Sequence, residues 1–464
     1  MDWNGRKVVV LGLGDTGLSM ARWLVRDGAQ VRVADTRSAP PHAQTLAREL
    51  PQAKLATGAF TEKTLSGADA IAISPGIDRR TPPIAAAIHH GVPVVGDVEL
   101  FAQALSSLVT RHSSLARPKV VAITGSNGKS TVTAMAGAMC VAAGRTTVVA
   151  GNIGVPVLDA LTAIEEGGTV PQAFVLELSS FQLESTASLA PDAATVLNVT
   201  EDHLDRYEGM TDYAAAKARV FAGNGVQVLN RDDRLTLNMA RTGRTIRTFG
   251  LAAPRDDSEW GIASDGARAL ARGTRRLMAS SELPLAGLHN AANALAAHAL
   301  ASAIGLPEEP LVRALREFRG LPHRTQKVAE IAGVTFFDDS KGTNVGATVA
   351  AMSGIDRPVV LIAGGDGKGQ DFSPLAPVVK QKARAVVLIG RDAVLIEKAL
   401  AGSGVTPAHA ADMNEAVAAG FAAARPGDAV LLSPACASFD MFRDYVQRAE
   451  AFVAAVRRLE KERG

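Results

Sequence analysis

Short, continuous apolar runs alternate with longer helical patterns along most of this chain, and this alternation constrains the fold more than any other feature. Residues 8–11, 31–34 and 70–73 are such runs, and residues 16–25 between the first two have the spacing of a helix. Strands that are apolar throughout are typical of parallel sheets covered by helices on both faces. The alternation therefore predicts an α/β fold, in which ligands bind at the carboxyl ends of the strands.

The alternation restarts twice, which predicts three domains in series. A length of 464 residues agrees with about three domains. We place the domains at residues 1–105, 106–320 and 321–464. Residues 106–118 are polar and irregular, so we predict a linker there. For residues 250–280 the sequence leaves antiparallel strands and a long loop equally open.

The composition narrows the class of protein. Lys plus Arg is 49 and Asp plus Glu is 47, a net charge of +2 that favours neither nucleic acid nor an anionic membrane as a partner. The chain has no apolar stretch of about 18 residues, so we expect no membrane insertion. The apolar run after Arg6-Lys7 is too short for a signal peptide. The 2 cysteines cannot build a disulfide framework or a zinc site by themselves, so a cytoplasmic location is expected.

The first loop that can do chemistry follows the run 8–11. Residues 12–17 match G-x-G-x-x-G between a strand and a helix, and Asp35 ends the next strand, 18 residues past Gly17. By itself this pattern favours NAD. The physics is less specific, because glycines let backbone N–H groups approach any diphosphate at a helix N-terminus. A nucleotide-type ligand and a plain tight turn both remain open.

A second loop, residues 124–131, reads Thr-Gly-Ser-Asn-Gly-Lys-Ser-Thr between a strand and a helix. In such a phosphate-binding loop the backbone N–H groups hold phosphate oxygens, Lys129 offers a charge to the β- and γ-phosphates, and the Ser130 hydroxyl can bind Mg²⁺. The loop departs from the usual pattern because position 123 is Ile rather than Gly. Glu177 ends the strand 174–176 and is a reasonable second magnesium ligand.

Further polar residues follow other strands, although each has a structural interpretation as well. His203 lies among carboxylates and could bind a metal, whereas spacing alone says nothing about Lys217. Asp339 could hold a ribose hydroxyl and Arg324 a phosphate. Lys368 and the loop 433–438 could bind an anionic substrate.

Taken together, these motifs resemble the Mur ligases of peptidoglycan synthesis. The resemblance rests on residues 124–131, 177–182, 198–203 and 339–341, which lie in the second and third predicted domains, and we expect it to extend over all three. Residues 364–368 and 433–440 resemble the members that add D-glutamate, and the Asp-Asn-Pro-Arg motif of diaminopimelate-adding members is absent. The resemblance implies N- and C-terminal Rossmann-like domains around a central P-loop ATPase-type domain.

The resemblance also implies a reaction and its partners. The expected enzyme joins D-glutamate to UDP-N-acetylmuramoyl-L-alanine through an acyl phosphate, using ATP and two Mg²⁺ ions, and acts as a monomer. The ligand of the first loop then becomes a UDP-sugar rather than NAD. Three alternatives stay open: a ligase with another acceptor, such as a folylpolyglutamate synthetase, an NAD-dependent oxidoreductase, and a non-catalytic nucleotide-dependent switch.

Finally, the resemblance assigns site residues. The expected catalytic residues are Lys129, His203 and Lys217, the last carrying a carbamate. The expected metal ligands are Ser130, Glu177, His203 and Lys217. ATP is expected at Gly125, Ser126, Asn127, Gly128, Lys129, Ser130, Thr131, Asn290, Asn293, Arg324 and Asp339. The UDP-sugar is expected at Thr16, Asp35, Thr36, Arg37, Gly76, Asn152, Ser179 and Gln182. D-Glutamate is expected at Thr343, Lys368, Ser438 and Phe439.

Overall fold

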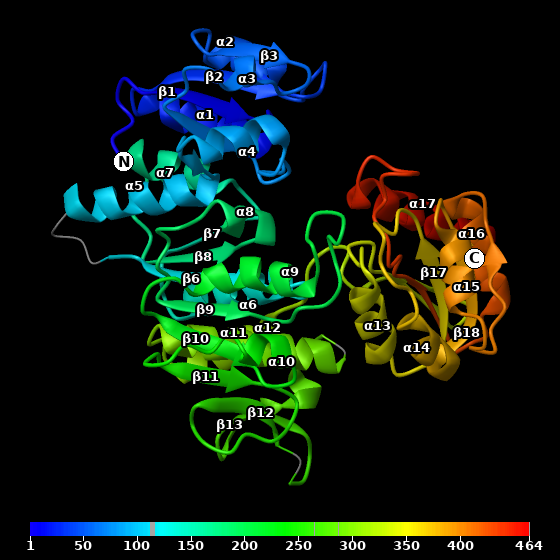
Figure 1. The fold of residues 1–464 in the computed structure, drawn as a ribbon. Coiled ribbons are helices and arrows are strands. Elements are labelled where there is room, and N and C mark those ends of the chain that lie inside the picture. The colour runs from blue at the N-terminus through cyan, green and yellow to red at the C-terminus, as the bar shows by residue number, and fades with distance from the viewer. Residues whose placement is uncertain (112–116, 264, 286, 464) are drawn as a thin grey trace.

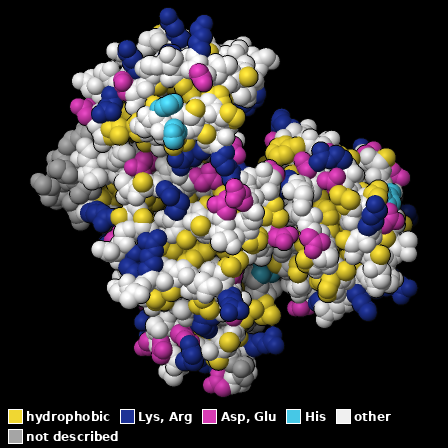
Figure 2. Space-filling view, viewed as in Figure 1, with side chains coloured by type: hydrophobic (Ala, Val, Ile, Leu, Met, Phe, Trp, Pro, Cys, Tyr) yellow, Lys and Arg dark blue, Asp and Glu magenta, His cyan; other side chains and the backbone are white. Residues whose placement is uncertain are grey.

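The structure of this chain is a computed structural model, which describes residues 1–111, 117–263, 265–285 and 287–463. It consists of three lobes, each built on its own β-sheet, which follow one another along the chain (Figure 1). On the face seen in Figure 2, basic and acidic side chains lie interspersed. Within the described ranges, no helix is both long and apolar enough to cross a membrane. The predicted α/β fold with three domains in series is confirmed.

The N-terminal lobe has a five-stranded parallel sheet in the order β3-β2-β1-β4-β5. Its strands are β1 Lys7–Leu11, β2 Gln30–Asp35, β3 Lys54–Thr57, β4 Ala70–Ile73 and β5 Val94–Val95. Its helices are α1 Asp15–Arg26, α2 Ala43–Glu49, α3 Glu62–Leu65 and α4 Pro82–His89. The central strands β1 and β4 are almost wholly buried, because helices cover both faces of the sheet.

Helix α5, Asp97–Arg111, follows β5 and corrects one sequence-based prediction. Residues 106–111 are the last turns of this helix rather than part of a linker, whereas residues 112–116 of the predicted linker lie outside the described residues. The helix packs onto the central lobe, where the Phe101 ring meets the Phe174 ring edge-on at 5.1 Å. The helix thus extends past residue 105 while its Phe101 side chain packs on the central lobe. The boundaries at 105 and 320 stay predictions.

The central lobe has a nine-stranded sheet in the order β14-β13-β12-β11-β10-β9-β6-β8-β7. Its strands are β6 Lys119–Thr124, β7 Thr147–Gly151, β8 Ala173–Glu177, β9 Ala193–Val196, β10 Val226–Asn230, β11 Ile246–Phe249, β12 Glu259–Ala263, β13 Ala269–Arg272 and β14 Arg275–Ala279. Its helices are α6 Lys129–Ala142, α7 Val157–Glu165, α8 Ser180–Glu184, α9 Met210–Ala218, α10 Arg234–Leu237, α11 Leu288–Ala303 and α12 Glu308–Glu317. Strand β13 pairs antiparallel with both neighbours, so antiparallel strands are the correct alternative for residues 250–280.

The C-terminal lobe has a six-stranded sheet in the order β15-β16-β20-β17-β18-β19, parallel except for the edge strand β15. Its strands are β15 Gln326–Ile331, β16 Val334–Asp338, β17 Val359–Gly364, β18 Ala383–Ile389, β19 Ala408–His409 and β20 Ala429–Leu432. Its helices are α13 Val345–Gly354, α14 Leu375–Lys382, α15 Ala393–Ala399, α16 Met413–Ala423 and α17 Tyr445–Arg463. The carboxyl ends of β16, β17 and β20 place the loops that carry the candidate site residues of this lobe.

Gly14 and Gly17, two of the three glycines of the first loop, make different demands on the fold, which gives a stability prediction. A Cβ on Gly17 would lie 1.8 Å from the Gly12 carbonyl oxygen, whereas a Cβ on Gly14 would meet nothing within 4 Å. We therefore expect Gly17→Ala to lower the free energy of unfolding of the N-terminal lobe by about 1–3 kcal/mol or more, because the backbone at Gly12 must move to make room for the methyl group. Gly14→Ala is the matched control, and thermal unfolding measures both. Equal melting curves for the two variants would contradict this tight turn.

Candidate active site

The phosphate-binding loop lies at the carboxyl end of β6, immediately before α6. Lys129 Nζ donates to the carbonyl oxygens of Gly125 at 2.8 Å and Ser126 at 2.9 Å. Gly128 adopts a left-handed φ of 84°, and a Cβ there would lie 2.6 Å from Asn293 Oδ1. The lysine therefore lies over a loop whose shape requires glycine, and phosphate oxygens can replace its neutral carbonyl partners.

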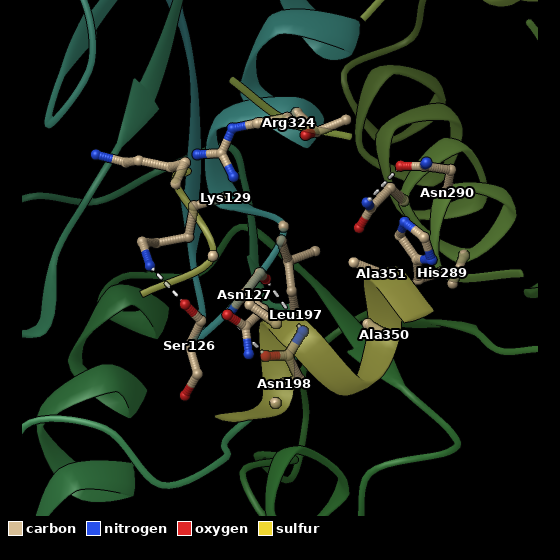
Figure 3. A pocket seen from close by; sticks show the side chains of 18 of the residues that line it. Ser126, Asn127, Lys129, Leu197, Asn198, His289, Asn290, Arg324, Ala350 and Ala351 are labelled. Carbon is tan, nitrogen blue, oxygen red and sulfur yellow. Dashed lines mark hydrogen bonds between the residues drawn. The ribbon is translucent and has the colours of Figure 1, made fainter. Parts of the chain in front are cut away.

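A cavity of about 550 Å³ opens beside this loop, between the central and C-terminal lobes (Figure 3). Most of the residues predicted to bind ATP line it, namely Ser126, Asn127, Gly128, Lys129, Thr131, Asn290, Asn293, Arg324 and Asp339. Apolar side chains such as Phe249, Leu251 and Leu285 also line it. A lining that combines a polar phosphate-binding loop with apolar side chains suits a ligand with phosphates and an aromatic base.

The C-terminal lobe contacts the phosphate-binding loop directly. Asn344 Nδ2 donates to Asn127 Oδ1 at 3.0 Å and to Asp202 Oδ2 at 3.2 Å. Lys368 Nζ donates to Asp202 Oδ1 at 2.7 Å, and this ion pair is nearly buried. Asp202 therefore receives two side chains from the C-terminal lobe, and these bonds hold the two lobes together across the cavity.

Two of the predicted magnesium ligands differ in how well they fit an ion. Glu177 is buried and its Oε1 accepts from Asn152 Nδ2 at 2.8 Å, whereas its Oε2 has no hydrogen-bond partner in the part of the chain that the structure describes. A buried carboxylate oxygen without a partner fits a bound cation. Ser130 Oγ, by contrast, is 2.5 Å from Arg324 Nη2, so this guanidinium must move or share the hydroxyl if Ser130 binds an ion.

Lys217 lies behind the same loop and does not line the cavity. The residue is only 1% exposed. Its Nζ donates to the Gly125 carbonyl at 2.9 Å and lies 4.4 Å from the centroid of the Tyr213 ring. Burial lowers the pKa of Lys217 well below its ordinary value, and the nearby Lys129 ammonium lowers it further. Two lysines therefore share one carbonyl oxygen, and the neutral amine of Lys217 is favoured.

His203 lines the cavity from the loop after β9. Its backbone has a φ of 56°, a left-handed conformation that residues other than glycine rarely adopt. Such strained residues often occur at functional sites. Burial lowers the pKa of its imidazole to about 4, so the ring is neutral near pH 7 and can bind a metal. The described residues contain no cluster of three or more His, Cys, Asp and Glu side chains that could hold an ion. Phosphate oxygens would have to complete the coordination.

A second cavity, of about 860 Å³, lies where all three lobes meet. Thr16 and His42 line it from the N-terminal lobe, Ser130 and Asn152 from the central lobe, and Lys341 from the C-terminal lobe. Asn152, Leu321, Arg324 and Lys341 line both cavities. A ligand in the second cavity can therefore reach the phosphate-binding loop.

Other residues predicted for the UDP-sugar lie at the carboxyl edge of the N-terminal sheet. Asp35 is buried and accepts from the Leu13 N–H at 2.7 Å and from Arg37 at 2.6 Å. These bonds, led by the one from Arg37, lower the pKa of Asp35 to about 2. The exposed Thr36 follows it, and Gly76 lies in the turn after the adjacent strand β4.

Ser179 and Gln182 form the N-terminal cap of α8. Ser179 Oγ accepts from the Gln182 N–H, and Gln182 Oε1 accepts from the Ser179 N–H at 3.1 Å. Gln182 is buried and also donates to Asp97 at 3.0 Å. The structure therefore gives Gln182 a structural role, and neither residue lines the two cavities.

The predicted D-glutamate residues are only partly brought together. Thr343 lines the first cavity, and the Lys368 loop lies beside the loop of Ser438 because Asp366 and Ala437 exchange two backbone hydrogen bonds. Ser438 is buried, whereas Phe439 is 74% exposed and lines neither cavity.

Sequence reasoning assigned no role to several residues that the structure places in the cavities. Asn198 exchanges two hydrogen bonds with the backbone of Asn127, at 2.8 Å and 3.1 Å. Lys341 lies 3.7 Å from the centroid of the Tyr445 ring, and burial lowers its pKa to about 8. The sequence feature that could have pointed to Asn198 and Lys341 as site residues is their position in loops that follow strands.

Comparison with protein-family models assigns each lobe. The model for the Mur ligase MurD-like N-terminal domain matches residues 6–96, the Mur ligase middle domain matches 123–301, and the Mur ligase glutamate ligase domain matches 323–436. The first loop thus lies in a segment typical of this family rather than of a dinucleotide-binding enzyme.

Individual proteins agree with the family models. The UDP-N-acetylmuramoylalanine–D-glutamate ligases of Thiobacillus denitrificans and Nitrosospira multiformis are 59% and 58% identical to this chain. The alignments cover 99% and 100% of this chain, and 98% of each relative. The crystal structure of UDP-N-acetylmuramate-alanine ligase MurC from Thermotoga maritima has the same fold, with a TM-score of 0.59, 19% identity, and coverage of 98% of this chain and 100% of that one.

Proposed function

We infer that this chain, which belongs to the Mur ligase family, is an ATP-dependent ligase that adds D-glutamate to UDP-N-acetylmuramoyl-L-alanine in the synthesis of peptidoglycan precursors. The observation that carries this inference is the 59% identity, over nearly the whole length of both chains, to a ligase named for that reaction. The phosphate-binding loop and its cavity supply the site for ATP. The same evidence disfavours the folylpolyglutamate synthetase, oxidoreductase and switch alternatives.

We place the three substrates in the two connected cavities. ATP occupies the first cavity, with its phosphates at Gly125–Thr131 and its base toward Asn290, Asn293 and the apolar side chains. The UDP group binds at the carboxyl edge of the N-terminal sheet, near Thr16, Asp35, Thr36, Arg37 and Gly76. The muramoyl-alanine end then extends past Asn152 and Ser179 toward the phosphate-binding loop. D-Glutamate enters from the C-terminal lobe, near Thr343, Lys368 and Ser438.

The chemistry follows from the need to activate a carboxylate. Amide formation from a free carboxylate would expel oxide, which is a poor leaving group. Attack of the carboxylate oxygen on the γ-phosphorus of ATP forms an acyl phosphate and releases ADP. The D-glutamate amine then attacks the acyl carbon, and the C–O bond breaks to give the amide and phosphate. Lys129, at the phosphate-binding loop, is placed to stabilise the charge on the transferring phosphoryl group.

The donor set for Mg²⁺ centres on Glu177, whose unpartnered oxygen fits one ion together with Ser130. We propose His203 and a carbamylated Lys217 for a second ion. When bound, Mg²⁺ would offset the negative charge of the phosphates and of the reacting carboxylate.

The surroundings of Lys217 support the carbamate. Only a neutral amine can attack CO₂, and burial beside Lys129 favours that form. The reaction makes an N–C bond and releases one proton to solvent. The product is an anion in place of a neutral amine, and this anion is attracted to the Lys129 ammonium.

We further propose that the enzyme acts as a monomer in the cytoplasm, where ATP is available. The lobes that line the two cavities follow one another in a single chain, so the proposed site needs no second copy.

Substrate dependence of phosphate release tests the proposed function. With ATP, Mg²⁺ and UDP-N-acetylmuramoyl-L-alanine, we expect release only when D-glutamate is added, and not with L-lysine or diaminopimelate. A parallel arm with a folate and L-glutamate should release no phosphate, and NADH should not bind. Release that depends on another amino acid, or on the folate, would overturn the assignment.

A further inference from the structure

Arg206 lies three residues after His203 and bridges two lobes, yet the proposed reaction leaves it without a role. Its side chain is 9% exposed. Nη1 donates to the Pro75 carbonyl at 2.9 Å, and Nη2 donates to the Ile77 carbonyl at 3.1 Å and to Glu184 Oε2 at 2.9 Å. One guanidinium therefore holds the turn after β4 of the N-terminal lobe to α8 of the central lobe.

The turn held by Arg206 belongs to the proposed UDP-sugar site. Its two acceptor carbonyls flank Gly76, which we assign to the UDP group. Ser74 in the same turn donates from Oγ to the Gly12 carbonyl at 3.3 Å, within the first loop. A shift of this turn would therefore move both loops that surround the diphosphate.

The other side of Arg206 supports the His203 loop. The guanidinium carbon lies 4.1 Å from the centroid of the Phe181 ring, and that ring lies 4.7 Å from the centroid of the His203 ring. The Arg206 N–H also donates to the His203 carbonyl at 2.9 Å. Stacking and a backbone bond together hold His203 in its left-handed conformation.

One nitrogen of the Arg206 guanidinium is left unsatisfied within the described part of the chain, which costs stability. Its Nε is buried and has no hydrogen-bond partner among the described residues. Buried donors without partners are rare and destabilising, and they occur where function outweighs stability.

We propose that Arg206 is a positioning residue that couples the UDP-sugar turn around Gly76 to the His203 loop. By fixing both segments, it sets the distance between the bound UDP group and the site where the muramoyl-alanine carboxylate is activated. Misplacement of a reacting group by about 1 Å can cost about 100-fold in rate. The proposal rests on the proposed function and deepens it by naming what aligns the donor substrate.

Arg206→Lys tests the proposal, because one ammonium cannot reproduce the planar fork that reaches three acceptors. We expect the KM for UDP-N-acetylmuramoyl-L-alanine to rise about 10- to 100-fold and kcat to fall, while the KM for ATP stays within about 2-fold. Arg79→Lys is the matched control, since Arg79 donates to the Glu184 carbonyl at the same interface, and among the described residues its guanidinium makes no hydrogen bond to the Gly76 turn and does not stack on Phe181. The control should keep the donor KM within about 2-fold.

The possible outcomes distinguish a failure of the Arg206 proposal from a failure of the proposed function. Equal rises in the KM for ATP and for the donor, or unchanged kinetics with a lower melting temperature, would overturn the role of Arg206. Wild-type enzyme that releases no phosphate with these substrates would overturn the proposed function instead. If Arg206→Lys does not fold, Glu184→Ala removes one acceptor of the guanidinium, and the donor KM should then rise about 3- to 10-fold. An unchanged donor KM in Glu184→Ala would also contradict the proposal.

Discussion

Lys129→Ala should abolish acyl phosphate formation, with a fall in the rate of phosphate release of at least about 10³-fold. The reason is that Lys129 is the cation of the phosphate-binding loop, where its Nζ lies against the Gly125 and Ser126 carbonyls and can stabilise the charge that develops during phosphoryl transfer. Binding of the UDP-sugar should survive, because its diphosphate is assigned to the N-terminal lobe. Single-turnover phosphate release and donor binding by calorimetry measure the two effects separately.

Lys119→Ala is the control for the loss of a positive charge. Lys119 lies at the opposite end of β6, is half-exposed, and pairs with Asp192 at 3.0 Å. An exposed pair of this kind contributes little, so the control should retain nearly full activity. If Lys129→Ala lost donor binding together with phosphate release, the division of the substrates between two lobes would be wrong.

Lys217→Ala should also be nearly inactive, with at least about 100-fold lower activity. The carbamate would supply an anion behind the phosphate-binding loop, and alanine cannot. A short carboxylic acid that enters the space left by the side chain should restore part of the activity. Steady-state rates with and without acetate or formate measure the rescue.

The rescue distinguishes this account from a simple loss of folding. Lys129→Ala lacks a cation rather than an anion, so the same acids should not restore its activity. Full activity of unrescued Lys217→Ala would contradict the carbamate. A second test unfolds the wild-type enzyme and refolds it in buffer from which dissolved CO₂ has been removed. Unchanged activity after this treatment would also contradict the carbamate.

The fold was largely predictable, because buried parallel strands show as continuous apolar runs. Strands such as β1, β4 and β8 lie within a residue or two of the predicted ranges. The end of α5 was missed because residues 106–111 carry several polar side chains, whereas its buried face, with Phe101, is defined only by contact with the central lobe. Helices that a neighbouring lobe stabilises lack a clear signal in the local sequence.

The candidate site was predictable where a motif fixes the local backbone. The phosphate-binding loop is such a case, since its glycines and Lys129 act within eight consecutive residues. The contacts of Asp202 with Asn344 and Lys368 were not predictable, because they join segments more than 140 residues apart. The first loop alone favoured NAD, since a short glycine pattern reports a diphosphate and not the rest of the ligand.

The central claim is that ATP converts the donor carboxylate into an acyl phosphate, and isotope transfer tests it most directly. UDP-N-acetylmuramoyl-L-alanine labelled with ¹⁸O in both oxygens of the alanine carboxylate is incubated with the enzyme, ATP, Mg²⁺ and D-glutamate. The account predicts that each phosphate released carries one ¹⁸O atom, because the carboxylate oxygen that attacked phosphorus leaves with it. Phosphate without ¹⁸O, with the displaced ¹⁸O atom found in water instead, would contradict it.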